Sequence, residues 1–210
     1  MNSALLFSAL GWLDLFGIAV FAVSGALVAA RNGQTLVTFA FFALVTGVGG
    51  GTVRDLLIGA PVFWVQDSRV PILCLAIALV VWMTPVRIWK AGAVDWFDAI
   101  GLAAYSVFGA AKALQLGIDP VPAAIMGVIT ASVGGVIRDL LAGEPSIIIR
   151  PEIYVTAGAL SAFAFVALAQ TGMSGIVAAV IAFVAGFALR ALAIVKGLSL
   201  PIYRGAGDDA

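Results

Sequence analysis

The amino-acid sequence predicts an all-α integral membrane protein with seven transmembrane helices, formed by a 3+3 inverted-topology repeat and a seventh helix. Of its 210 residues, 63% are hydrophobic and only 10% are charged, whereas roughly a quarter of the residues in soluble domains are charged. Its apolar runs are continuous, as spanning helices of about 20 residues require, and do not alternate as strands of a membrane barrel do. A pattern of residues in the first part of the chain also recurs 84 residues further on. These three observations predict the fold class.

The chain divides into seven expected spans. We place them at residues 12–30, 36–58, 71–89, 98–116, 121–142, 153–170 and 174–196. Glycines mark the breaks between spans: Gly33, Gly117 and Gly172. Prolines lie at starts of spans, where a missing N–H is tolerated: Pro71, Pro120, Pro122 and Pro151. Asp14 and Asp98 come where the first and fourth spans begin, and N-capping is their expected role.

Basic residues in short loops predict the orientation. With the N-terminus outside, the inner segments collect most of them: Arg31, Arg87, Lys90, Arg150, Lys196 and Arg204. The outer loops hold only Arg69. We therefore expect a multi-pass protein of the cell (inner) membrane, with its N-terminus outside and its C-terminus in the cytoplasm.

Composition excludes several classes of function. The formal net charge is zero, so no basic surface predicts a nucleic-acid partner. The chain has no histidine and a single cysteine, Cys74, so neither a metal site nor an intramolecular disulfide is expected. No nucleophile–base pair indicates an enzyme. The N-terminus lacks the positive region of a signal peptide, so the first span is expected to be retained.

A duplication relates two parts of the sequence. Residues 49–57 read GGGTVRDLL and residues 134–141 read GGVIRDLL, and a shift of 84 residues aligns them without a gap. The same shift places Asp14 on Asp98, and Pro61 on Pro145. We expect one transmembrane domain over residues 1–210, with repeat one at about 12–90, repeat two at about 96–172 and the seventh helix at about 174–196. Three spans per repeat is an odd number, so the second repeat is inverted, and such folds place their sites near the midplane.

The repeated motif supplies the main candidate site residues. They are Gly49, Gly50, Gly51, Arg54, Asp55, Gly134, Gly135, Arg138 and Asp139. Glycine lets a helix kink and lets another backbone approach closely, and these glycines are expected to break their helices near the middle. Each buried charge costs about 2.5–3.5 kcal/mol, so the charged pairs are expected to face a polar interior between the first, second, fourth and fifth spans. Adjacent residues do not face one another on a helix, so each charge is expected to pair elsewhere. Two roles stay open for them: bordering an ion path, or joining helices.

Other polar residues are weaker candidates. Hydroxyl side chains can line a path or bond to carbonyls of their own helix: Ser24, Thr46, Ser106, Thr130 and Ser132. Lys112 lies near the outer end of the fourth span, where reaching toward the interface is favoured over a site. Close helix packing is the favoured role of four further glycines: Gly17, Gly25, Gly101 and Gly109.

The doubled motif, with a seventh helix after a 3+3 repeat, resembles the prokaryotic trimeric intracellular cation (TRIC) channels, over about Asp14 to Lys196. The resemblance implies a homotrimer in membrane lipids, with an hourglass pore in each subunit that conducts monovalent cations, mainly K⁺ and possibly also Na⁺, without any cofactor. It also implies that the second and fifth spans kink at the glycines and line the pore. Animal members carry a lysine before two glycines, where this chain has Gly49, so lipid-headgroup binding at that position is not expected.

Two alternatives to a channel remain. The same family has been labelled a glycine transporter domain, which implies a secondary carrier of a small solute, and a purely structural membrane protein is also compatible. An amino-acid carrier needs polar groups for carboxylate and ammonium at one depth, whereas these charges lie at two depths, about 10 Å from each helix centre. This favours a pore. Arginines beside a cation path repel cations unless neutralised, and we expect pairing with Asp55 and Asp139 across helices to neutralise them.

Overall fold

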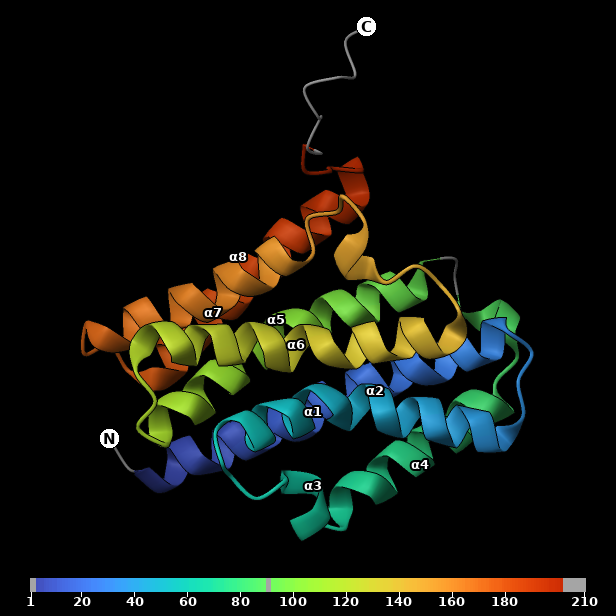
Figure 1. Ribbon diagram of the computed structural model, residues 1–210, viewed down its shortest axis with the longest axis horizontal. Helices are drawn as coiled ribbons and strands as arrows, with labels where there is room; N and C mark the ends of the chain where they lie inside the picture. The colour runs from blue at the N-terminus through green and yellow to red at the C-terminus, as the bar shows by residue number, and fades with distance from the viewer. Residues whose placement is uncertain (1–2, 90–91, 202–210) are drawn as a thin grey trace, which may run out of the picture.

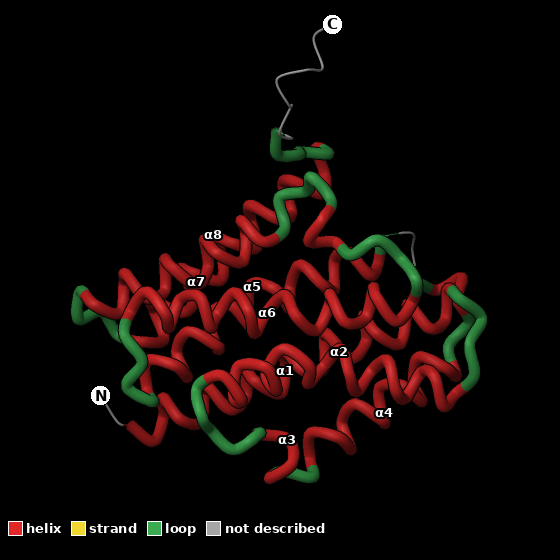
Figure 2. Tube along the Cα trace, in the orientation of Figure 1, coloured by secondary structure: helices red, strands yellow, loops and turns green. Residues whose placement is uncertain are grey.

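The computed structural model describes residues 3–89 and 92–201, which fold into long helices joined by short connections (Figures 1 and 2). The helices are α1 Ser3–Arg31, α2 Leu36–Leu57, α3 Phe63–Gln66, α4 Arg69–Met83, α5 Ala93–Gln115, α6 Pro120–Ala142, α7 Val155–Gln170 and α8 Gly175–Lys196. Two short 3₁₀ helices are η1 Val86–Ile88 and η2 Ile147–Ile149. Lys90 and Arg204, two of the basic residues that predict the orientation in the membrane, lie outside the described residues.

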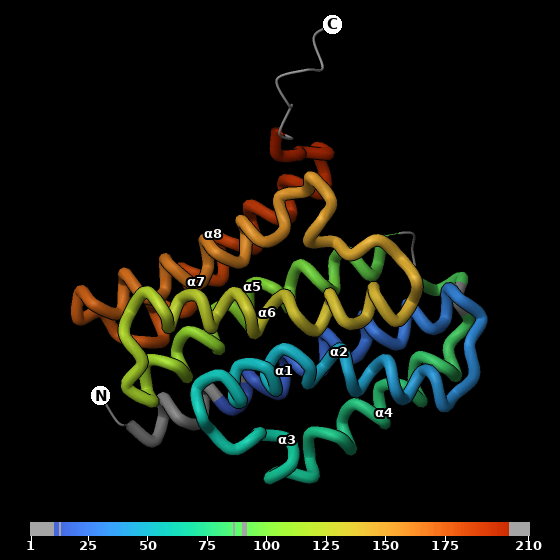
Figure 3. The backbone as a smooth tube through the Cα atoms, viewed as in Figure 1, coloured from blue at the N-terminus to red at the C-terminus, as the bar shows by residue number. Residues whose placement is uncertain are grey.

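Successive long helices run in alternating directions (Figures 1 and 3). α1, α2, α5 and α6 pack against one another in the middle of the molecule; α4 lies on α1 and α2, and the α7–α8 pair lies on α5 and α6. Because α1, α2 and α4 are followed by α5, α6 and α7 in opposite directions, the second triplet is inverted relative to the first. α2 and α6 therefore lie side by side and antiparallel.

Within the described residues, five helices are long and apolar enough to cross a membrane: α1, α2, α5, α6 and α8. α4 and α7 are also apolar but are shorter, with 15 and 16 residues. Large apolar side chains point outward along these helices, as a lipid-facing surface requires; Val195 of α8, for example, is 71% exposed. The chain is a multi-pass membrane protein.

Several expected helix boundaries were wrong. α4 ends at Met83 rather than residue 89, because Thr84 is extended (ψ 132°) before Pro85, whose ring disfavours a helical residue ahead of it. The turn of helix α3 was not expected. The N-capping role expected for Asp14 and Asp98 is also wrong, since α1 begins at Ser3 and α5 at Ala93, and both carboxylates lie within their helices.

The expected breaks between helices are confirmed at three glycines. Gly33, Gly117 and Gly172 have φ values of 60°, 80° and 78°, which residues with a Cβ rarely adopt. Pro120 is the first residue of α6, as its missing N–H predicts. Pro151, by contrast, lies before α7, which begins at Val155.

Candidate functional site

The glycine motifs hold α2 and α6 in close contact. α2 runs as one helix through Gly49, Gly50 and Gly51, and α6 runs as one helix through Gly134 and Gly135. The expected interruption of these helices is therefore wrong. A Cβ on Gly50 would collide with the carbonyl of Thr130, and one on Gly134 would collide with the carbonyl of Thr46. The two glycines thus let the two backbones touch.

Four other glycines make close contacts with neighbouring helices, and these contacts form pairs related by the 84-residue shift. Gly17 faces the ring of Tyr105, and Gly101 faces the ring of Phe21, whose position corresponds to that of Tyr105. Gly25 and Gly109 likewise face Thr46 and Thr130. The close packing expected for these four glycines is confirmed, and each contact has its counterpart in the other repeat.

Arg54, Asp55 and Lys112 form a buried group that we call the α2 cluster. Arg54 donates from Nε to Asp55 Oδ1 over 2.9 Å, and Lys112 Nζ lies 2.9 and 3.1 Å from the two carboxylate oxygens. The backbone N–H of Phe63 donates to Asp55 Oδ2 over 3.0 Å. Arg54 is fully buried, and its guanidinium lies 5.3 Å from the ring centre of Phe108 and 5.8 Å from that of Phe63.

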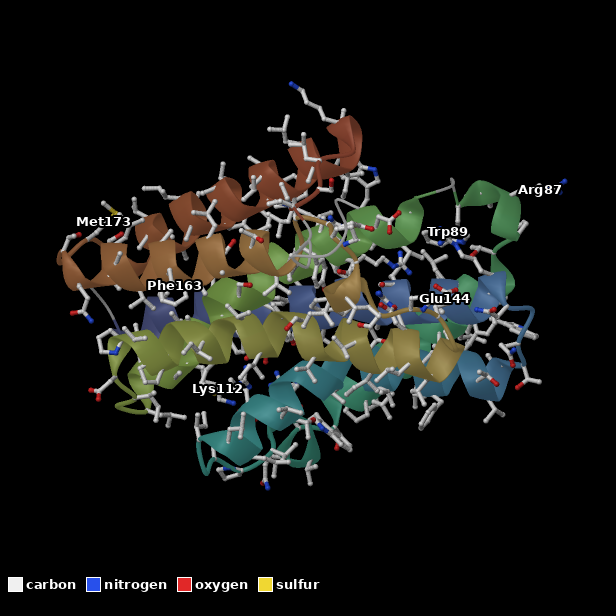
Figure 4. The ribbon with its side chains drawn as sticks, turned by 45° about the horizontal axis from the view of Figure 1, so that its top comes forward. Arg87, Trp89, Lys112, Glu144, Phe163 and Met173 are labelled. Atoms are coloured by element: carbon white, nitrogen blue, oxygen red, sulfur yellow. The ribbon has the colours of Figure 1, made fainter. Side chains whose placement is uncertain are left out.

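Two expectations about this cluster were wrong. Arg54 pairs with its neighbour Asp55, because an arginine side chain is long enough to fold back along the helix although the two Cβ atoms point apart. Lys112 does not extend toward the interface; its side chain is 24% exposed and its amine bonds to Asp55. Figure 4 shows Lys112 reaching from α5 toward the end of α2.

Arg138, Asp139 and Asp98 form a second buried group, the α6 cluster. Arg138 donates from Nε to Asp139 Oδ1 over 2.9 Å and from a terminal nitrogen to Asp98 Oδ1 over 2.6 Å. It also donates to the hydroxyl of Ser24. The backbone N–H of Ile147 donates to Asp139 Oδ2 over 2.9 Å, and Ile147 corresponds to Phe63 at the 84-residue shift.

The two clusters share a scaffold but differ in charge. In both, an arginine and the next aspartate pair, and a backbone N–H eight residues further on holds the carboxylate. The α2 cluster holds two cations and one carboxylate, a formal charge of +1, and the α6 cluster holds one cation and two carboxylates, a formal charge of −1. The inverted repeat therefore positions the two clusters alike without making them chemically equivalent.

The candidate hydroxyls divide into three groups. Thr130 and Ser132 donate to carbonyls of their own helix over 2.5 and 2.7 Å. Ser24 belongs to the α6 cluster. The hydroxyls of Thr46 and Ser106 are buried and have no hydrogen-bond partner within the described part of the chain. All five side chains are buried.

Sequence reasoning missed Arg190 of α8. Its guanidinium is 2% exposed, lies 2.7 Å from Glu152 and stacks over the ring of Tyr154 at 5.4 Å. The sequence carried a signal for it, because Arg190 is the one charged residue inside α8 ahead of the terminal Lys196. Tyr154 is itself buried, next to Gly135. Arg190 thus joins α8 to the neighbourhood of the α6 cluster.

Two surface pockets lie near the two clusters. The α1 pocket, of about 370 Å³, is lined by Trp12, Asp14, Phe63, Asp67, Arg69 and Val70, among others. The α8 pocket, of about 320 Å³, is lined by Asp95, Arg150, Glu152, Arg190, Ile194 and Ser199, among others. Phe63 links the first pocket to Arg54, and Arg190 links the second to Tyr154. The end of α8 lines the second pocket, whereas the residues lining the first come from α1 and the segment from α3 to α4.

The chain is similar in sequence to a protein family and to several bacterial membrane proteins. A family model described as Glycine transporter matches it twice, over residues 11–85 and 95–170, which together make up more than half of the chain. The UPF0126 membrane protein of Vibrio cholerae is 38% identical over 215 residues, covering 96% of this chain and 86% of the relative. The UPF0126 inner membrane protein YadS of Escherichia coli K12 is 38% identical over 159 residues, covering 70% of this chain and 72% of the relative.

Two solved channel structures have the same fold. A TRIC trimeric intracellular cation channel orthologue from Rhodobacter sphaeroides superposes with a TM-score of 0.84 at 44% identity, covering 91% of this chain and all of that one. A prokaryotic TRIC channel crystallised in 0.5 M KCl superposes with a TM-score of 0.81 at 28% identity, covering 92% of this chain and all of that one. The chain belongs to the membrane-protein family described as Glycine transporter, and it resembles the prokaryotic TRIC channels in fold and sequence.

Proposed function

We propose that the protein is a cation channel that conducts mainly K⁺, with one pore in each subunit of a homotrimer. The observation that carries the proposal is the placement of two buried charged clusters at different depths along the antiparallel α2–α6 pair. Each cluster lies beside a pocket at one end of the molecule. The likeness to solved cation channels supports the same function.

In this proposal the ion path runs along α2 and α6 between the two pockets, past the candidate residues of both glycine motifs. Arg54 and Arg138 are 0% and 2% exposed, so ions can pass only when these side chains move. The carboxylates paired with them offset the repulsion that an unpaired arginine would exert on a cation. The predicted orientation puts the α1 pocket outside and the α8 pocket on the cytoplasmic side.

A secondary carrier of a small solute such as glycine is the second candidate, and the description of the matching family model favours it. An amino-acid carrier would gather groups for a carboxylate and an ammonium in one place. Here the positively charged α2 cluster and the negatively charged α6 cluster lie on different stretches of the path, one at the end of α2 and one at the end of α6. This separation favours the channel.

Flux from proteoliposomes tests the proposal. Purified protein should release K⁺ down its gradient, and the release should not depend on glycine on either side of the membrane. Labelled glycine should not accumulate in the same vesicles. Glycine uptake driven by an ion gradient, with no K⁺ release of its own, would favour the carrier instead.

A further inference from the structure

Asp14 and Asp98 occupy corresponding positions of the two repeats but have different surroundings. Asp98 is 1% exposed and lies 2.6 Å from a terminal nitrogen of Arg138. Asp14 is half-buried, and within the described residues no cationic side chain lies within 4.0 Å of it. Arg54, which corresponds to Arg138, instead lies between two aromatic rings. The duplication thus leaves one carboxylate without the arginine that neutralises its counterpart.

The partner of Asp14 is a neutral donor. The hydroxyl of Tyr105 donates to Asp14 Oδ1 over 3.0 Å, and Phe21 stands at the corresponding position of the first repeat, where no such bond can form. A phenol hydrogen bond orients the carboxylate but leaves its negative charge in place. Asp14 is therefore a fixed and charged group rather than half of an ion pair.

The carboxylate faces the α1 pocket. That pocket of about 370 Å³ is lined by Asp14 together with Asp67 and Arg69. Asp67 and Arg69 neutralise one another, with 2.7 Å between Oδ2 and the guanidinium. Asp14 is therefore the lining carboxylate whose charge is not offset by a lining cation.

On the proposed path, a cation entering from the α1 pocket passes Asp14 before it reaches the α2 cluster. The α2 cluster carries a formal charge of +1 and would repel a cation that enters from this pocket. A fixed negative charge in a narrow mouth raises the local concentration of cations and lowers that of anions. Asp14 brings the formal charge of this end of the path to zero.

We propose that Asp14 selects cations over anions at the mouth of the pore formed by the α1 pocket, by attracting a hydrated monovalent cation ahead of the α2 cluster. The proposal rests on the proposed channel function. It assigns to the first repeat a selectivity residue that the second repeat lacks, because Asp98 is paired with Arg138.

Recordings in planar bilayers with asymmetric KCl test the inference. Asp14→Asn should lower the K⁺ to Cl⁻ permeability ratio and reduce the conductance roughly two- to fivefold at about 0.03 M salt. The difference should vanish near 1 M, where the Debye length is about 3 Å and fixed charges are screened. Asp14→Glu, which keeps the negative charge at this position, should retain the K⁺ to Cl⁻ permeability ratio of the original protein.

Asp119→Asn is the matched control. Asp119 is exposed at the start of α6, caps no backbone N–H with its side chain, and does not line the α1 pocket. It lies on the same predicted side of the membrane, so its loss removes the same charge away from the mouth. This variant should leave the permeability ratio and the low-salt conductance unchanged.

A cysteine at Trp12 covers the case in which Asp14→Asn does not assemble. Trp12 lines the α1 pocket and is 71% exposed. In a Cys74→Ala background, a positively charged thiol reagent should lower the low-salt conductance and a negatively charged one should raise it. Equal effects of both reagents, or an Asp14→Asn channel with unchanged selectivity at low salt, would overturn the inference. Absence of unitary currents from the original protein would instead overturn the channel function itself.

Discussion

Asp55 and Asp139 connect more groups than any other carboxylates of the two clusters. Each binds the preceding arginine and the backbone N–H of the residue eight positions further on, so each joins the end of its helix to the following turn. Their remaining partners differ. Asp55 is the only carboxylate bonded to Arg54 or Lys112 within the described residues, whereas Arg138 has Asp98 as a second acceptor.

This difference predicts unequal effects of neutralisation. Asp55→Asn leaves two cations of the α2 cluster without a carboxylate, and loss of one partner of a buried ion pair typically costs about 3–5 kcal/mol. Asp139→Asn should cost less, because Arg138 keeps its ion pair with Asp98. The thermal midpoint of the purified protein should therefore fall further for Asp55→Asn. K⁺ flux per correctly assembled protein should fall in both variants, and unchanged flux with reduced yield alone would make the charges purely structural.

The buried charges could be predicted from the sequence, but their partners could not. Arg54 and Asp55 stand out in an apolar helix whatever they bond to. The directions of the Cβ atoms on a helix do not determine how far an arginine side chain folds back, so the ion pair between Arg54 and Asp55 could not be predicted. Lys112 was misjudged because its bond to Asp55 depends on α5 lying beside the end of α2, which is a tertiary contact.

At the scale of the helices, the contact between α2 and α6 depends on two glycines. A methyl group at Gly50 or Gly134 would meet a backbone carbonyl of the other helix, and backbone cannot rotate away as a side chain can. Hydropathy and the repeat located both helices from the sequence. The motif did not decide between a broken helix and a close approach of two backbones, because a glycine permits either.

Alanine substitution separates this contact from helix propensity. Alanine favours a helix by about 1 kcal/mol over glycine. A Cβ at Gly11 would meet no described atom within 4 Å, so Gly11→Ala should keep or slightly raise the thermal midpoint. Gly50→Ala and Gly134→Ala should lower it by an amount corresponding to about 1–3 kcal/mol of overpacking. The larger Gly50→Val and Gly134→Val should also reduce K⁺ flux. Normal stability of both alanine variants would contradict the close contact.

At the scale of the whole molecule, the odd number of spans predicts that the two ends of the chain lie on opposite sides of the membrane. Cysteines placed at positions 2 and 208, both outside the described residues, should report this in a Cys74→Ala background. An impermeant thiol reagent added outside should label position 2 in intact cells and position 208 only after lysis. Labelling of both positions from one side would contradict the seven-span topology.

The duplication supplies a scaffold with two similar halves, and a few substitutions make the halves different. The 84-residue register predicted which residues correspond, and the paired glycine contacts follow that register. The register shows that Phe108 corresponds to Ser24, but it could not predict that these two residues would contact Arg54 and Arg138. It also could not predict that α8 would line one pocket, because α8 lies outside the repeat. Charge asymmetry along a symmetric backbone is therefore a property of the folded molecule.

Single-channel recording of the purified protein in planar bilayers tests the central claim most directly. In asymmetric KCl we expect discrete unitary currents that reverse near the K⁺ equilibrium potential. These currents should be far larger than the turnover of a carrier allows. A correctly assembled protein that passes no unitary current, and instead moves solute at carrier rates, would show that the protein is not a channel.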